Sequence, residues 1–176
     1  PIYSNRDVEF ATASFGQGFN VTPVQVIRAF SALANNGVPV NPYIVKEIRT
    51  PDGKVVKSFS PTYLDPALKP ETAKEISIVL THVVDTSLQN GALAFPHHSV
   101  AAKTGTAQMV GQNGKYSQDR YLHSMFAYIP ASDPKYLVFL YNVYPKGVEY
   151  ASSSLAKPLF SYLQFLISYG TIKPDR

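Results

Sequence analysis

The amino-acid sequence predicts an α+β fold in which an antiparallel sheet is flanked by helices. Three strand-like runs follow one another, at residues 100–110, 121–129 and 136–144. The connections between them are short, and short connections favour antiparallel neighbours. Segments with apolar residues at helical spacing precede and follow these runs, and they can cover the sheet.

The clearest helix is expected in residues 21–37, "VTPVQVIRAFSALANNG". Thr22 can cap its start with Gln25 reaching back, and Pro23 occupies the first helical position. Gly37 is expected to end the helix.

Three further elements are expected. Residues 43–59 are typical of a hairpin with Asp52-Gly53 at its turn. A second helix begins at Pro70, and a C-terminal helix at residues 152–170 is bent or delayed by Pro158. Their predicted inward residues are Ala73, Ile76, Val79, Leu80 and Val83 in the second helix, and Leu155, Leu159, Tyr162, Leu163 and Leu166 in the last.

The third strand-like run, "YLVFLYNVY", is almost wholly apolar. This is expected of a strand that is covered on both faces. Such a sheet needs another strand or a helix beyond it, and we find no strand candidate near the start of the chain.

Composition excludes several classes of function. The chain has 176 residues, 45% of them hydrophobic and 16% charged, which is typical of a globular domain. Its 16 Lys and Arg are scattered and the net charge is only +4, so no nucleic-acid partner is expected. There is no cysteine, which excludes disulfides and thiolate chemistry.

Residues 101–110, "AAKTGTAQMV", place a cation, two hydroxyls and a glycine in a predicted strand. One interpretation is a solvated strand end with a glycine bulge. A phosphate-binding loop is excluded, because Ala101 and Ala102 stand where glycines should precede the lysine. The other interpretation is catalytic, because Lys-Thr-Gly on a strand is a signature of penicillin-binding proteins and serine β-lactamases.

The surrounding sequence favours the catalytic interpretation. "SVAAKTGTAQ" leads into a polar loop and then into "HSMFAYIPASDPKYLVFLYNVY", and "FATASFGQGFNVTPVQVIRAFSALANNG" lies upstream. This succession resembles the class B penicillin-binding proteins, and most of all their cell-division type of peptidoglycan D,D-transpeptidase. The resemblance covers essentially the whole chain.

The resemblance implies roles for four residues. The strand would be a sheet edge along which a peptide lies as an added strand. Lys103 would place its ammonium beside the nucleophile, and Thr104 and Thr106 would offer hydroxyls to a terminal carboxylate. Thr106 is the expected partner of the carboxylate, and its backbone N–H would form half of the oxyanion hole. Gly105 would let the substrate approach the backbone closely.

The family also needs Ser-x-x-Lys and Ser-x-Asn motifs before the Lys-Thr-Gly strand. Ser154 and Lys157 match the first spacing, but they follow Lys103 and begin the C-terminal helix, so we treat the match as coincidence. We treat Tyr3-Ser4-Asn5 in the same way. Residues 1–176 are therefore expected to be the C-terminal portion of one transpeptidase domain, inactive alone, with the nucleophilic serine upstream.

For the full-length protein, the resemblance implies cross-linking of D-Ala-D-Ala stem peptides through a serine acyl-enzyme, inhibition by β-lactams, and no cofactor. It also implies that the partners are divisome membrane proteins. The protein would be located on the extracytoplasmic face of the bacterial inner membrane, held there by an N-terminal membrane helix outside this chain. Two alternatives remain, a penicillin-sensing or divisome-scaffold domain and a serine β-lactamase.

Other motifs favour structural interpretations. His97 and His98 are adjacent and would point to opposite sides of a strand, so they cannot both bind one metal ion. A solvated loop is favoured at these residues, and no metal site is expected in the chain. His123 is expected to be structural, although it lies opposite the Lys-Thr-Gly strand. "SFGQG", residues 14–18, lacks the strand and the third glycine of a dinucleotide site, and a turn with positive φ is favoured.

Overall fold

The computed structural model describes residues 6–111, 114–170 and 172–176. Its helices and antiparallel strands confirm the α+β class. The chain divides into two compact units. One consists of residues 22–76, and the other consists of the described residues before and after that segment.

In the unit of residues 22–76, α2 (Pro23–Ala34) starts with the expected capping box between Thr22 and Gln25. Gly37 has φ +88°, and a Cβ there would lie 2.0 Å from the carbonyl oxygen of Leu68. Glycine is therefore required at Gly37 by both its backbone conformation and its close neighbour.

The hairpin in the same unit also forms as expected. Strand β2 (Glu47–Arg49) pairs antiparallel with β3 (Val55–Ser58), and Gly53 in the turn has φ +88°. A second short pair, β1 (Val40–Asn41) with β4 (Thr62–Tyr63), was not predicted. Its strands are only two residues long, too short to produce a recognisable alternation.

The larger sheet has the order β5–β6–β7, with both pairs antiparallel, as the short connections predict. Its strands are β5 (Ala101–Val110), β6 (Tyr116–Ile129) and β7 (Tyr136–Val143). Strand β6 begins at Tyr116 instead of Tyr121, so the expected polar loop is partly strand. Residues 112–113 of that loop lie outside the described residues.

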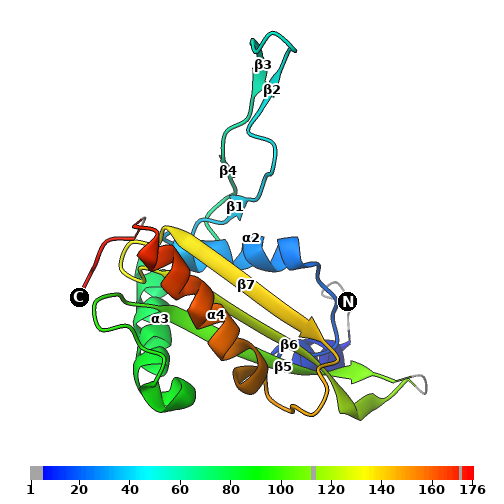
Figure 1. Ribbon diagram of the computed structural model, residues 1–176. Coiled ribbons are helices and arrows are strands. Elements are labelled where there is room, and N and C mark those ends of the chain that lie inside the picture. The colour runs from blue at the N-terminus through cyan, green and yellow to red at the C-terminus, as the bar shows by residue number, and fades with distance from the viewer. Residues whose placement is uncertain (1–5, 112–113, 171) are drawn as a thin grey trace. The chain divides into compact units, whose positions relative to one another are not determined.

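Helix α4 (Ala151–Ser168) packs along one face of this sheet (Figure 1). It starts at Ala151 and continues through Pro158, so the expected delay of its first turn is wrong. Tyr162 is also wrong as an inward residue, because it is 49% exposed. The core between α4 and the sheet includes Leu155, Leu159, Leu163, Met125, Ala127 and Ile129.

Helix α3 (Pro70–His82) continues into a π-helical turn, Val83–Ser87, and then into a short turn, Leu88–Gly91. Val84 is fully buried in the core, whereas Val79, which was expected to face inward, is 61% exposed. The buried stripe follows Leu80 and Val84, with the half-buried Ser77 one turn before Leu80, and Val79 lies off that stripe.

In the described part of the chain, strand β7 is not covered on both faces, because Tyr141 and Val143 are each 53% exposed and no described strand pairs with its outer edge. This agrees with the lack of a further strand candidate in the sequence. A helix, α1 (Asp7–Ala13), precedes the glycine turn and was not predicted; it has no buried residue and therefore no apolar stripe to recognise. Among the described residues, no helix has the length and apolarity needed to cross a membrane.

Candidate active site

The Lys-Thr-Gly-Thr run lies near the middle of β5. This strand pairs with β6 on one side only, so it forms an edge of the sheet in the described part of the chain. The strand is regular through residues 103–106, and its bulge lies further on, between Gln108 and Val110. The glycine is therefore not the bulge that the simpler interpretation expected.

The side chains of this run alternate between the two faces of the sheet. Lys103 is paired with Phe126, and Thr106 is paired with His123. Thr106 lies on the α4 face, since its hydroxyl contacts the start of α4, and alternation places Lys103 on the opposite face. A ligand can reach both side chains only along the open edge of β5.

Lys103 has an exposed side chain. Its Nζ donates a hydrogen bond to the carbonyl oxygen of Thr104 at 2.7 Å, so the ammonium lies beside the strand backbone. The ion pairs found between described side chains join other residues. The positive charge of Lys103 is therefore accessible at the strand edge.

Gly105 lies against Ser124 of β6. A Cβ at Gly105 would be 2.6 Å from the Ser124 Oγ, closer than side-chain carbons normally approach. The glycine thus makes room for a serine hydroxyl on the neighbouring strand. This is a packing reason for Gly105, in addition to the close substrate approach that the sequence analysis expects.

Thr106 supports the start of α4. Its Oγ1 accepts a hydrogen bond from the backbone N–H of Ala151 at 3.0 Å. Ala151 is fully buried, and Tyr150 before it provides no side-chain cap. Thr106 therefore satisfies a helix N–H that would otherwise lack a partner in the first turn.

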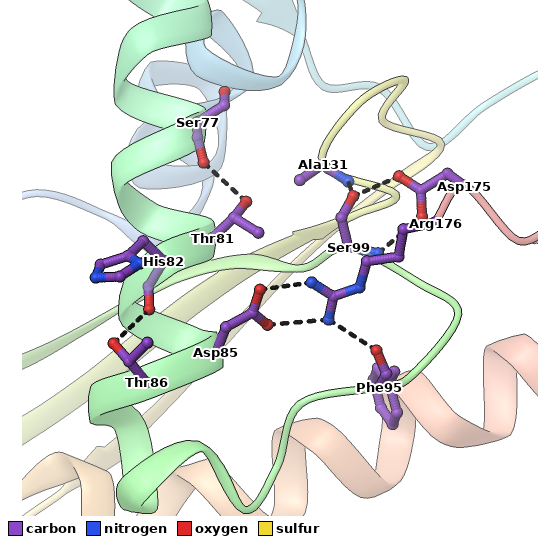
Figure 2. Close-up of polar contacts among 10 residues, drawn as sticks. All are labelled: Ser77, Thr81, His82, Asp85, Thr86, Phe95, Ser99, Ala131, Asp175 and Arg176. Carbon is purple, nitrogen blue, oxygen red and sulfur yellow. Dashed lines mark hydrogen bonds and ion pairs between the residues drawn. The ribbon is translucent and has the colours of Figure 1, made fainter.

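The C-terminal residues hold the segment that leads into β5. The Asp175 carboxylate accepts hydrogen bonds from the Ser99 backbone N–H at 2.7 Å and from the Ser99 hydroxyl (Figure 2). It also accepts a hydrogen bond from the Ser132 hydroxyl. Partial burial favours a higher pKa for Asp175, but the hydrogen bonds from Ser132 and Ser99 outweigh it and lower the pKa below the ordinary value of 3.8.

Arg176 makes a second connection at the same place. Its guanidinium forms a two-pronged ion pair with Asp85, with N–O distances of 2.5 and 2.9 Å, and donates to the carbonyl of Phe95 at 2.7 Å (Figure 2). The C-terminal tail therefore joins the turn after α3 to the chain entering β5. The roles of Asp175 and Arg176 could not be predicted from the sequence, because no local pattern indicates contacts between residues so far apart along the chain.

The histidines are not part of a metal-binding cluster among the described residues. No group of three or more His, Asp or Glu in the described part of the chain is suited to hold a metal ion. His97 is exposed as expected, but His98 is only 8% exposed, so a solvated loop is wrong for His98. Its Nε2 is buried without a hydrogen-bond partner among the described residues.

Ser154 lies in the first turn of α4, as the sequence predicts. Its Oγ is 2.7 Å from the Nδ1 of His123. This contact is on the α4 face of the sheet, whereas Lys103 emerges on the other face. The structure therefore does not bring Ser154 together with Lys103. Tyr3-Ser4-Asn5 lies outside the described residues.

The glycine turn before α2 has the expected conformation. Gly16 and Gly18 both have φ +81°. A Cβ on Gly18 would also lie 2.6 Å from the Thr12 Oγ1, so the turn needs glycine for two reasons.

Lys-Thr-Gly on an open edge of the sheet in an α+β unit is the arrangement that characterises penicillin-binding proteins and the related β-lactamases. A family model described as "Penicillin binding protein transpeptidase domain" matches residues 2–163. The chain therefore belongs to the penicillin-binding protein transpeptidase family.

Known proteins agree with this assignment. The chain is 38% identical over 160 residues to stage V sporulation protein D of Bacillus subtilis, and 29% identical over 176 residues to peptidoglycan D,D-transpeptidase FtsI of Escherichia coli. The matches cover 90% and 96% of this chain but only 24% and 27% of those relatives. The chain thus spans about a quarter of the length of the curated relatives it matches.

Solved structures give the same result. Penicillin-binding protein 3 from Mycobacterium tuberculosis, complexed with aztreonam, superimposes with a TM-score of 0.83 at 27% identity. That match covers the whole of this chain and 41% of the other. The same protein complexed with ampicillin also has a TM-score of 0.83. The resemblance to class B penicillin-binding proteins that the sequence analysis stated is confirmed.

Proposed function

We propose that this chain is the C-terminal portion of the transpeptidase domain of a peptidoglycan D,D-transpeptidase. The observation that carries the proposal is the Lys103–Thr106 run on the open edge of β5, with its ammonium accessible. The Ser-x-x-Lys and Ser-x-Asn motifs would lie in chain preceding residues 1–176. The isolated 176-residue chain would then be inactive.

The reaction proposed for the full-length protein is acyl transfer. The serine hydroxyl attacks the penultimate D-Ala carbonyl of a stem peptide, and its proton passes through neighbouring side chains to the amine of the departing D-Ala. An amine of a second stem peptide then attacks the acyl-enzyme and releases the serine. The products are a new peptide cross-link and free D-Ala.

Residues of β5 would bind the donor peptide and assist its reaction. The Lys103 ammonium would stabilise negative charge near the serine and assist proton transfer. The hydroxyls of Thr104 and Thr106 would bind the terminal carboxylate, with Thr106 as the main partner. The backbone of Gly105 would approach the substrate, and the N–H of Thr106 would contribute to the oxyanion hole.

Three properties of the relatives are part of the same proposal. β-Lactams would acylate the serine, as the aztreonam and ampicillin complexes of the similar structures suggest. The protein would act outside the cytoplasm, anchored to the inner membrane by an N-terminal helix. The resemblance of the sequence to the cell-division type of transpeptidase favours divisome membrane proteins as its partners. A sensing or scaffold domain has no separate observation in its favour.

The test is to label the full-length protein with a fluorescent penicillin and map the modified peptide by mass spectrometry. The proposal predicts one penicilloylated serine, within a Ser-x-x-Lys sequence that precedes this segment. Absence of labelling, or labelling of Ser154, would overturn it. Release of D-Ala from a pentapeptide donor, measured on the same preparation, distinguishes an enzyme from a penicillin sensor.

A further inference from the structure

His123 is a fully buried histidine that the proposed chemistry does not use. Both of its ring nitrogens have partners: Nε2 lies 2.9 Å from the carbonyl oxygen of Glu149, and Nδ1 lies 2.7 Å from the Ser154 Oγ. A carbonyl can only accept, so Nε2 carries a proton. In the neutral ring, Nδ1 then accepts the hydroxyl proton of Ser154.

These two partners lie on either side of the residue that contacts Thr106. Glu149 and Ser154 flank Ala151, whose N–H donates to the Thr106 Oγ1 at 3.0 Å. His123 is also the direct cross-strand neighbour of Thr106. The start of α4 is therefore held from two adjacent strands, through His123 on β6 and Thr106 on β5.

The contact with Ala151 limits what the Thr106 hydroxyl can do. A hydroxyl has one proton and two lone pairs, and here one lone pair is taken by the helix N–H. The proton must therefore point away from Ala151. Thr106 is exposed at the edge strand, so a carboxylate lying along that edge can accept the proton.

A catalytic Ser154–His123 pair does not fit the same geometry. The Ser154 side chain is half-buried, and its hydroxyl has a second, longer contact of 3.4 Å with the carbonyl of Ala151 in its own helical turn. Its ring partner is fully buried. Both side chains lie on the α4 face, away from the ammonium of Lys103.

We propose that His123 and Ser154 are positioning residues for Thr106. By fixing the chain on both sides of Ala151, they hold the Ala151 N–H against the Thr106 hydroxyl and keep its proton directed to the ligand carboxylate. This inference rests on the proposed function, because it assigns the carboxylate of a penicillin or stem peptide to Thr106.

The test is a double-mutant cycle in the full-length protein, with the second-order rate constant of acylation by benzylpenicillin as the readout. Ser154→Ala removes the hydroxyl without adding volume and suits a helix. Loss of hydroxyl orientation should lower the rate constant by about three- to tenfold. In the Thr106→Val background, where there is no hydroxyl to orient, the same change should alter the rate constant by less than about twofold.

Two further variants complete the experiment. Ser153→Ala is the matched control, because Ser153 lies in the same turn with an exposed side chain, and it should leave the rate constant unchanged. Ser154→Thr keeps the hydroxyl and should retain most of the wild-type rate. Together these results would show that the acylation rate constant depends on the hydroxyl of Ser154 and not on substitution in this helical turn as such.

Three outcomes would overturn the inference. The first is an acylation rate constant in Ser154→Ala equal to that of the wild type. The second is an equal loss of rate from Ser154→Ala whether position 106 carries threonine or valine. The third is a loss of rate in Ser154→Thr as large as that in Ser154→Ala. An equal loss is what a purely structural role predicts, since independent effects add. If the wild-type protein is not acylated at all, the proposed function itself fails, and that result is distinct from the other three.

Discussion

Thr106 and His123 stand opposite each other on β5 and β6, and both contact the first turn of α4 or the chain just before it. The strand that would bind substrate is thus connected directly to the start of the C-terminal helix. A change in Thr106 therefore affects two properties, the binding of a carboxylate and the stability of α4. The two effects have to be separated experimentally.

Thr106→Val should weaken acylation by carboxylate-bearing penicillins, because it removes a hydrogen bond to a charged group that is worth about 1.5–3 kcal/mol. The same change removes the acceptor of the Ala151 N–H, which should lower the free energy of unfolding by about 1 kcal/mol. Acylation kinetics and thermal unfolding of the full-length protein measure the two effects separately.

Thr106→Ser is the matched control for this prediction. It keeps the hydroxyl and should retain both stability and most of the acylation rate. Equal acylation by the valine and serine variants would contradict the carboxylate-binding role of Thr106.

Gly105→Ala should lower the free energy of unfolding only when Ser124 is present. A Cβ at Gly105 would be 2.6 Å from the Ser124 Oγ, so Ser124 must move. In a Ser124→Ala background this clash is gone, and alanine in place of a strand glycine should raise the free energy of unfolding by about 0.5–1 kcal/mol.

Chemical denaturation of the four proteins in this cycle measures the coupling between the two positions. We expect an interaction in which Ser124→Ala rescues Gly105→Ala. Additive effects would mean that the close approach between the strands does not determine the choice of glycine.

Asp175 should make the stability of the protein sensitive to acid. Its pKa is lowered in the folded state, because the Ser132 and Ser99 hydrogen bonds outweigh the effect of burial. A carboxyl with a depressed pKa contributes stability above its unfolded pKa, and that contribution is lost as the pH falls through the folded value. The affected range therefore starts near pH 4 and extends below it.

Asp175→Asn removes this titration. The variant should be less stable than the wild type at pH 7, and the difference should shrink as the pH falls below about 4. Unfolding midpoints at a series of pH values provide the measurement. A difference that stays constant down to pH 2 would mean that the Asp175 carboxylate does not stabilise the entry to β5.

Much of the fold could be predicted from local sequence. The capping box at Thr22, the glycine turn at Gly53 and the order of β5, β6 and β7 are all determined by nearby residues or short connections. The edge position of Lys103 followed from the resemblance to a family, since periodicity alone gives no strand order. Exposed positions such as Val79 and Tyr162 were misassigned because a helical period shows a stripe but not its width.

The supporting contacts of the candidate site were beyond sequence reasoning. Asp175 reaches Ser99 and Arg176 reaches Asp85, and no local pattern connects positions so far apart. The cross-strand pairing of Gly105 with Ser124 depends on register, which is fixed only when the strands pair. His123 is expected from the sequence to be structural, and it is fully buried with partners for both ring nitrogens, but its partner Ser154 is recognisable in the sequence only as a coincidental motif.

The most direct test of β5 as the active-site strand is the rate of penicillin acylation in the full-length protein carrying Lys103→Ala. The Lys103 side chain is exposed on an edge strand, so its removal should leave the unfolding temperature nearly unchanged while acylation is abolished. An acylation rate near that of the wild type, in a folded Lys103→Ala protein, would contradict the claim that the β5 edge is the active site.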